Sequence, residues 1–259
     1  MKKLLFAVFL ILIMAFSFSA CGGDSSNENG DAIGNEEIAE LYTTPDNFKG
    51  RSYEFTGMVL DFERDGDECY IQVYQDIKNY ENNTVVTYTD SELSLKENDF
   101  IIVKGTVEGA FSGENYFGSD IEVPQVTATK VKKIDATEAF PAEKTIDVNK
   151  TVEKGSYKVT VSKVDFTADE TRIYLAVTNN SSSTFDNYPD QSVIVQDGKQ
   201  YDAEWNEYYP EPNTELKSGA TSESVIAFDR VEEADFTFSF EGWNDDYDEL
   251  EFSFDISVE

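Results

Sequence analysis

The chain has 259 residues, of which 20 are basic and 52 acidic, so its formal net charge is −32, and it contains no histidine. This charge disfavours binding to nucleic acid phosphates or anionic lipid headgroups and favours cations or basic partners. The lack of histidine removes the usual general base and the commonest transition-metal ligand, which argues against catalytic triads and zinc sites. Hydrophobic residues make up 40% of the chain, so it can build packed cores and the acidic excess does not indicate disorder.

The first 20 residues have the pattern of a secretory signal peptide, with two lysines before an apolar run over 4–16. This run is shorter than the about 20 apolar residues that a spanning helix needs. The segment Phe18-Ser19-Ala20-Cys21 resembles the lipobox of bacterial lipoproteins. The resemblance implies cleavage after residue 20 and acylation of Cys21, with palmitate-type chains that anchor the protein in the lipid bilayer. We therefore expect a lipid-anchored protein on the extracellular face of the cell membrane.

Residues 21–35 follow as the acylated cysteine and a small, polar stretch that is typical of a flexible linker. A short helix is then expected, because Asn35 is a good N-cap and acidic residues occupy the next two positions. One face of this helix carries Ile38, Leu41 and Tyr42, and Pro45 is expected to end it.

From Tyr53 the apolar residues alternate with a period of two, which predicts strands over 53–64, 68–76, 84–89, 100–108 and 123–134. In the first of these strands the apolar phase changes across Gly57, which predicts a bulge there. Cys69 lies on an apolar strand face, and we expect a buried, unreactive thiol. With Cys21 acylated, no internal disulfide is expected.

Three motifs in this half carry a resemblance to a known fold: residues 41–50 (Leu-Tyr-Thr-Thr-Pro-Asp-Asn-Phe-Lys-Gly), 53–59 (Tyr-Glu-Phe-Thr-Gly-Met-Val) and 98–107 (Asn-Asp-Phe-Ile-Ile-Val-Lys-Gly-Thr-Val). They resemble the OB-fold, in particular the anticodon-binding-like version found in Gram-positive secreted proteins. The resemblance implies that residues 36–135 form a five-stranded barrel with a short N-terminal helix. Relatives of the wider fold bind oligonucleotides or sugars. Acidic residues outnumber basic ones in this half, so nucleic acid is not an expected partner.

Residues 136–143 are interpreted as a linker, and seven further strands are expected after it. Their ranges are 157–166, 171–179, 191–196, 200–205, 222–228, 236–241 and 250–256. Strands of this number and spacing indicate an antiparallel sandwich. Residues 177–181, 201–205, 216–221 and 225–229 resemble an immunoglobulin-like domain of unknown function that recurs in Gram-positive surface lipoproteins. The resemblance implies an immunoglobulin-like β-sandwich over 144–259, and hence an all-β protein.

The first candidate site is an aromatic and acidic stretch whose rings are Tyr201, Trp205, Tyr208 and Tyr209. Such rings can stack on a sugar face or mark a protein interface, with neighbouring carboxylates accepting hydroxyl groups. The alternative is that these aromatic side chains cap the core of the sandwich.

The second candidate site is the acidic turn that contains Asp245, Asp246 and Asp248. Calcium takes six to eight oxygen ligands from such loops, but the spacing does not fit an EF-hand. The alternative is a turn of solvated acids. No cofactor is expected.

These observations predict a membrane-anchored extracytoplasmic lipoprotein that acts as a non-enzymatic binding or scaffold protein for a protein or a cell-wall polymer. Two alternatives stay open. One is an extracellular glycan hydrolase that uses paired carboxylates. The other is a calcium-dependent adhesion module.

Overall fold

The computed structural model describes residues 31–114, 120–204, 208–210, 212–244 and 246–258. These residues form mostly β-strands with a few short helices, so the predicted all-β class is confirmed. None of the helices in these ranges is long and apolar enough to cross a bilayer. The predicted signal peptide, with Cys21, lies outside the described residues.

Three short helices precede the first strand: η1 (Asn35–Glu37), α1 (Ile38–Thr43) and η2 (Pro45–Phe48). The first begins at Asn35, so its cap is Gly34, one residue before the predicted cap, and the Gly34 amide donates to Glu37 Oε2 at 3.0 Å. The same carboxylate pairs with Arg51 at 2.7 Å, and this contact ties the helices to the start of the first strand. Leu41 and Phe48 are buried against the barrel core, so this region folds as a lid on the barrel.

The first five strands close into a barrel in the order β1-β2-β3-β5-β4. Their bounds are β1 (Ser52–Asp65), β2 (Glu68–Asp76), β3 (Glu81–Thr89), β4 (Phe100–Glu114) and β5 (Asp120–Ile134). All neighbours are antiparallel except β3 and β5, which pair in parallel and close the barrel. Each expected strand of this half is present, and β4 continues to Glu114, beyond its predicted end. The barrel interior includes Cys69, which is fully buried as expected.

The sequence predicted a bulge at Gly57, but the irregularity in β1 lies a few residues further along the strand. The register shifts between Val59 and Asp61, so Leu60 is the extra residue. Gly57 serves a different purpose, because a Cβ there would lie 2.4 Å from Val73 Cγ1 and 2.7 Å from the Tyr74 carbonyl oxygen. The glycine therefore lets β1 and β2 approach closely.

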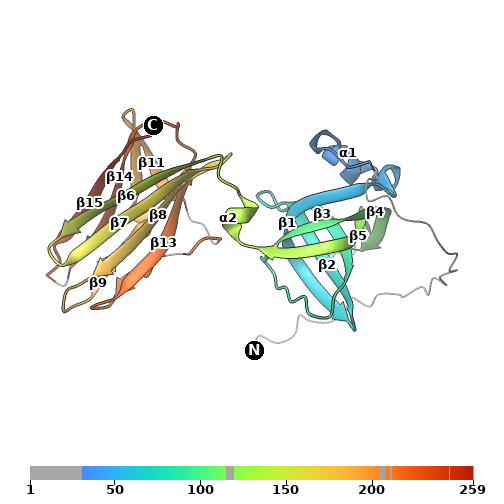
Figure 1. Ribbon diagram of the computed structural model, residues 1–259, viewed down its shortest axis with the longest axis horizontal. Helices are drawn as coiled ribbons and strands as arrows, with labels where there is room; N and C mark the ends of the chain where they lie inside the picture. Colours follow the sequence, from blue (N-terminus) through green and yellow to red (C-terminus); the bar gives the residue numbers. More distant parts are fainter. Residues whose placement is uncertain (1–30, 115–119, 205–207, 211, 245, 259) are drawn as a thin grey trace.

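Ten strands form the second body, and α2 (Ala136–Ala139) lies between it and the barrel (Figure 1). The strands are β6 (Lys144–Lys154), β7 (Tyr157–Phe166), β8 (Glu170–Asn179), β9 (Phe185–Asn187), β10 (Val193–Gln196), β11 (Lys199–Glu204), β12 (Glu215–Leu216), β13 (Thr221–Asp229), β14 (Phe236–Trp243) and β15 (Glu249–Ile256), with η3 (Pro189–Gln191) before β10. Strands β6, β9 and β12 were not expected from the sequence. The strand β11 pairs first with β10 and then with β13, and so links the two halves of the sheet.

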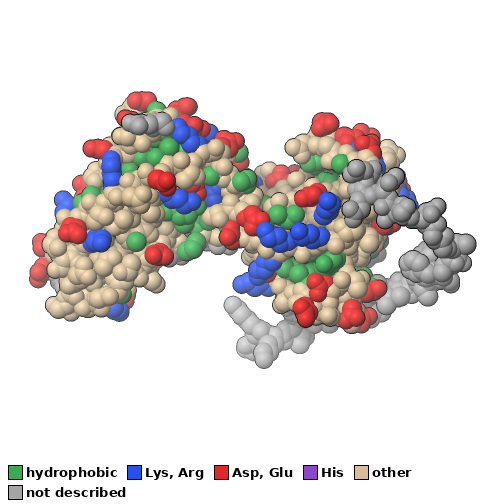
Figure 2. All heavy atoms as spheres, viewed as in Figure 1, with side chains coloured by type: hydrophobic (Ala, Val, Ile, Leu, Met, Phe, Trp, Pro, Cys, Tyr) green, Lys and Arg blue, Asp and Glu red, His purple; other side chains and the backbone are tan. Residues whose placement is uncertain are grey.

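The core of the second body is shared by both halves of this antiparallel sheet. Phe236, Phe238 and Phe240 of β14 are paired with Ile256, Phe254 and Phe252 of β15, and all six are buried. They pack in one cluster with the buried valine, leucine and isoleucine side chains of β7, β8 and β13. The halves therefore face each other across one apolar layer. On the face shown in Figure 2, acidic side chains lie over both bodies, and lysine and arginine side chains are interspersed among them.

Candidate functional site

The two bodies meet at an apolar cluster, which we call the junction cluster. Its buried members are Met58, Ile77, Phe100 and Ile134 from the barrel, Ala136 from α2, and Tyr209 and Ala227 from the second body. Partly buried rings, including Phe140 and Tyr208, pack against it. Because the cluster draws on both bodies and on the segment between them, burial of its side chains holds the three parts together.

Rings and polar groups from opposite sides reinforce this contact. The Phe100 ring of the barrel lies 5.2 Å from the ring of Tyr208, in an edge-to-face arrangement. The Tyr80 hydroxyl lies 3.0 Å from the Tyr208 hydroxyl. A salt bridge of 2.6 Å joins Lys78 of the barrel to Asp169 of the second body. The loop that carries Tyr208 is itself fixed, because the amide of Val225 in β13 donates to the Pro210 carbonyl at 3.0 Å.

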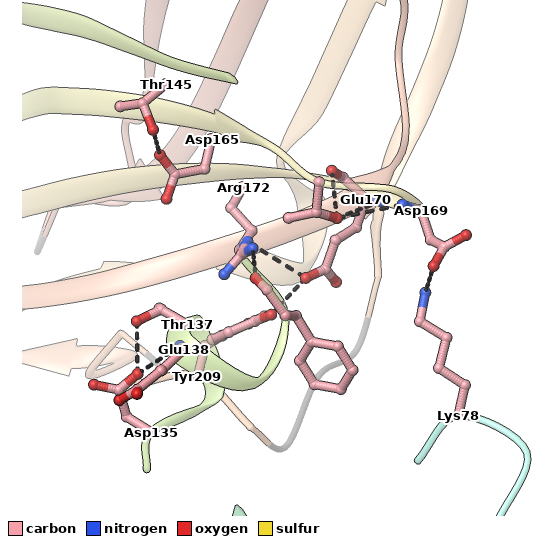
Figure 3. A network of polar contacts seen from close by, with 12 residues as sticks. Lys78, Asp135, Thr137, Glu138, Thr145, Asp165, Asp169, Glu170, Arg172 and Tyr209 are labelled. Carbon is pink, nitrogen blue, oxygen red and sulfur yellow. Dashed lines mark hydrogen bonds and ion pairs between the residues drawn. The ribbon is translucent and has the colours of Figure 1, made fainter. Parts of the chain in front are cut away.

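A buried arginine lies at the centre of the polar contacts (Figure 3). Arg172 of β8 is fully buried, and its Nη2 donates to the carbonyl oxygen of Phe140 in the segment between the bodies. Its Nε lies 3.4 Å from Glu170 Oε1, and its guanidinium lies 5.1 Å from the centre of the Tyr209 ring. The Tyr209 hydroxyl donates to Glu170 Oε1 at 2.5 Å. One buried side chain therefore contacts the strand, the linking segment and the tyrosine loop.

The protonation of the groups around Arg172 follows from their surroundings. Burial raises the pKa of Tyr209, and its hydrogen bond to Glu170 raises it further, so this phenol stays neutral and donates. Burial also raises the pKa of Tyr174. For Asp165 burial alone raises the pKa, but hydrogen bonds from Lys163 and Thr145 lower it more, and the net pKa lies below its usual value of 3.8.

Beside the junction cluster lies a pocket of about 480 Å³, which we call the junction pocket. It lies over the outer face of β7, β8 and β13 and is closed by α2 and by the loop of Tyr208 and Tyr209. Ala176 and Val225 contribute to its apolar surface, and Glu223 contributes a carboxylate. Its volume is in the range of pockets that hold small ligands.

The four aromatic residues singled out in the sequence do not form one surface. Tyr208 and Tyr209 line the junction pocket, and Tyr209 is only 5% exposed. Tyr201 packs against the core of the second body instead, with Lys199 Nζ 4.1 Å above its ring. Trp205 lies outside the described residues. Two of the four thus belong to a candidate site, which is built with residues from other elements.

The acidic turn after β14 is organised by an asparagine side chain. Asn244 Oδ1 accepts hydrogen bonds from the amides of Asp246 and Asp248, at 3.0 and 2.8 Å. Asp245 lies outside the described residues. No group of three or more potential metal-ligating side chains is found among the residues that the structure describes.

Sequence reasoning missed Arg172, Tyr174 and Glu223. The first two alternate with the buried Ile173 and Leu175 in β8, so their positions belong to the outer face of the sheet. A polar residue at such a position usually contacts water. Here α2 and the tyrosine loop cover that face, and the alternating pattern alone carries no signal of a cover that comes from distant residues.

Comparisons with known proteins give no identity to this chain. No family model matches it, and no curated protein matches it. Among solved structures, a functionally unknown protein from Listeria monocytogenes EGD-e has a TM-score of 0.38 at 9% identity, and the match covers 49% of this chain and 94% of that protein. The secreted serine protease VesC from Vibrio cholerae has a TM-score of 0.29 at 11% identity, covering 87% of this chain and 48% of that protein. These likenesses are too weak to carry a functional argument.

Proposed function

We propose that the protein is a lipid-anchored, non-enzymatic binding protein on the extracellular face of the cell membrane, and that the junction pocket holds its ligand or an anchoring group of its partner. In this proposal the first body is an OB-like barrel and the second an immunoglobulin-like sandwich. The strand order β1-β2-β3-β5-β4, with its parallel β3–β5 closure, supports the first assignment. The antiparallel layers around one core support the second.

The observation that carries the proposal is the pocket between the outer face of the second body and the α2 segment, next to the contact between the two bodies. The junction cluster and the Arg172 contacts fix the pocket walls before a ligand arrives, and a preformed site loses less entropy on binding. Its carboxylates are those of Asp135 and Glu223. Hydrogen bonds from the Thr137 side chain and the Glu138 amide lower the pKa of Asp135, which keeps it ionised and unable to act as a proton donor near neutral pH. This chemistry supports binding rather than hydrolysis.

A pocket-filling substitution tests the binding role. Ala176 faces the pocket from β8, so Ala176→Leu is expected to block it without entering the sandwich core. The matched control is Thr178→Leu, two residues further along the same face and outside the pocket lining. The soluble form, residues 22–259, is incubated with membrane-protein extract and with isolated cell wall. Capture of a partner that Ala176→Leu abolishes and Thr178→Leu preserves supports the proposal, whereas equal capture by all three proteins refutes the pocket as the site.

The anchor is tested separately by metabolic labelling with palmitate. The full-length protein is expected to incorporate label and to fractionate with membranes, and Cys21→Ser is expected to lose both properties. An unlabelled wild-type protein in the cytosol, with residues 1–20 still attached, would contradict the lipoprotein proposal.

A further inference from the structure

The charges around the junction pocket leave it negative. Asp135 and Glu223 line it, and no lysine or arginine is among its lining residues. Two cations beside rings that line the pocket are already paired: Lys163 lies 2.8 Å from Asp165, and Arg172 Nε lies 3.4 Å from Glu170. Within the described residues Glu223 has no hydrogen-bond or ion-pair partner, and it is exposed at the pocket edge. An anionic group is therefore repelled from this pocket and a cation is attracted.

The aromatic walls have the same preference. Tyr174, Tyr208 and Tyr209 line the pocket, and an aromatic ring attracts a cation to its face. Two of these rings already contact cationic side chains of the protein. Lys163 Nζ lies 3.9 Å from the centre of the Tyr174 ring, and the Arg172 guanidinium lies 5.1 Å from the centre of the Tyr209 ring. The chain thus places ammonium and guanidinium groups against the very rings that form the pocket.

Three hydroxyl groups that line the pocket already have hydrogen-bond partners, which disfavours a sugar ring. Thr160 bonds to Thr151 at 2.9 Å, and Ser162 donates to the Tyr174 carbonyl at 3.2 Å. Thr137 donates to Asp135 at 2.7 Å. The hydroxyl oxygens of Tyr174 and Ser224 are buried, so a ligand covered with hydroxyl groups would find few accessible partners here and would lose its own hydrogen bonds to water. An aliphatic stem, by contrast, matches the apolar surface of Ala136, Ala176 and Val225.

We propose that the junction pocket binds an organic ammonium group on an aliphatic stem, such as the side chain of lysine in a basic partner or a free alkylamine. This inference rests on the proposed binding function and names the chemistry of the ligand. The stem lies on the apolar wall between β8 and the tyrosine loop, and the ammonium group meets Glu223 and the ring of Tyr208. The charge of the whole chain, −32, raises the local concentration of such a ligand.

The test is a calorimetric titration of the soluble form, residues 22–259, with Nα-acetyl-lysine methylamide. The matched ligand is the same compound acetylated on Nε, which keeps the stem and removes the charge. We expect the charged compound to bind about five- to tenfold more tightly, because the acetylated compound lacks one charge contact and one cation–ring contact. Equal affinity for the two compounds, or no heat with either, would overturn the proposal.

Two variants locate the effect. Glu223→Gln is expected to weaken the charged compound about fivefold, whereas Glu153→Gln on β6, which changes the net charge by the same amount away from the pocket, is expected to leave it unchanged. Equal losses in the two variants would mean that only the overall field acts, and would refute a specific site. A lysine pentapeptide that binds more tightly than n-butylamine points to a protein partner, and equal binding points to a free amine.

The result also separates this inference from the broader proposal. If the amines do not bind but Ala176→Leu still abolishes capture of a partner, the pocket is a binding site of other chemistry and only the present inference fails. If Ala176→Leu has no effect either, both fail.

Discussion

Removing the Arg172 guanidinium is expected to weaken the contact between the two bodies more than any exposed substitution. The Arg172 side chain is fully buried, with 0% of it accessible to solvent, and the Glu170 side chain beside it is 18% accessible. Arg172→Ala leaves the Glu170 carboxylate without its cation and the Phe140 carbonyl without its donor. Breaking one partner of a buried pair costs about 3–5 kcal/mol, because the remaining charge stays desolvated.

Urea unfolding of the soluble form measures this loss. With a slope of about 2 kcal/mol per molar urea, a loss of 3–5 kcal/mol lowers the midpoint by about 1.5–2.5 M. The companion substitution Glu170→Gln removes the stranded charge, so the double variant is expected to lose less than the sum of the two single losses. The control is Arg230→Ala, at an arginine whose partners Glu143 and Glu233 are accessible to water, and its midpoint is expected to change little.

The reasoning is refuted if Arg172→Ala lowers the midpoint no more than Arg230→Ala does. It is also refuted if the losses from Arg172→Ala and Glu170→Gln simply add, because independent effects would mean that the two side chains do not interact. Arg172→Lys gives a further check. Lysine keeps the charge but cannot contact both the carbonyl and the carboxylate with a planar fork, so it is expected to recover only part of the stability.

Three further results are expected. Because the folded pKa of Asp165 lies below its usual value of 3.8, the stability it supplies is complete above that pH and is lost as the pH falls below it; the acid-induced drop in melting temperature is therefore expected to shrink in Asp165→Asn, and an unchanged pH profile would contradict this. Gly57→Ala is expected to cost about 1–3 kcal/mol in urea unfolding, because its Cβ meets the backbone of β2, whereas Thr56→Ala on the same strand serves as control; equal stability of the two variants would contradict the close approach of β1 and β2. Cys69, fully buried, is expected to react with a thiol reagent only when the protein unfolds, and rapid reaction of the native protein would show that the barrel core is open.

The sequence predicted the strands well wherever a strand has one buried face and one exposed face. Alternating apolar residues located all five barrel strands and both phenylalanine rows of the second body, because each row faces an interior. Strand β6 was missed because its apolar positions are few and only half-buried, which weakens the alternation. Met58 lies in the strand predicted over 53–64, yet its side chain is buried in the junction cluster and not in the barrel core.

The junction itself had only a partial signal in the sequence. Tyr208 and Tyr209 stood out as aromatic residues in an acidic stretch, and both line the junction pocket. Their partners were invisible, because Phe100 and Arg172 come from strands that are distant in the sequence and whose patterns already satisfied a core of their own. Contact between two bodies depends on surfaces that each body alone would expose, and periodicity describes each body alone.

The order of the chain has a consequence for its assembly. The barrel is complete at Ile134, but Tyr208 and Tyr209, which cover Met58 and Phe100, arrive only after much of the second body has been synthesised. Until then the finished barrel exposes these apolar side chains to water. A fragment ending at residue 135 is therefore expected to self-associate, and a nascent chain paused there would need a chaperone or a neighbouring surface to keep it apart from its copies.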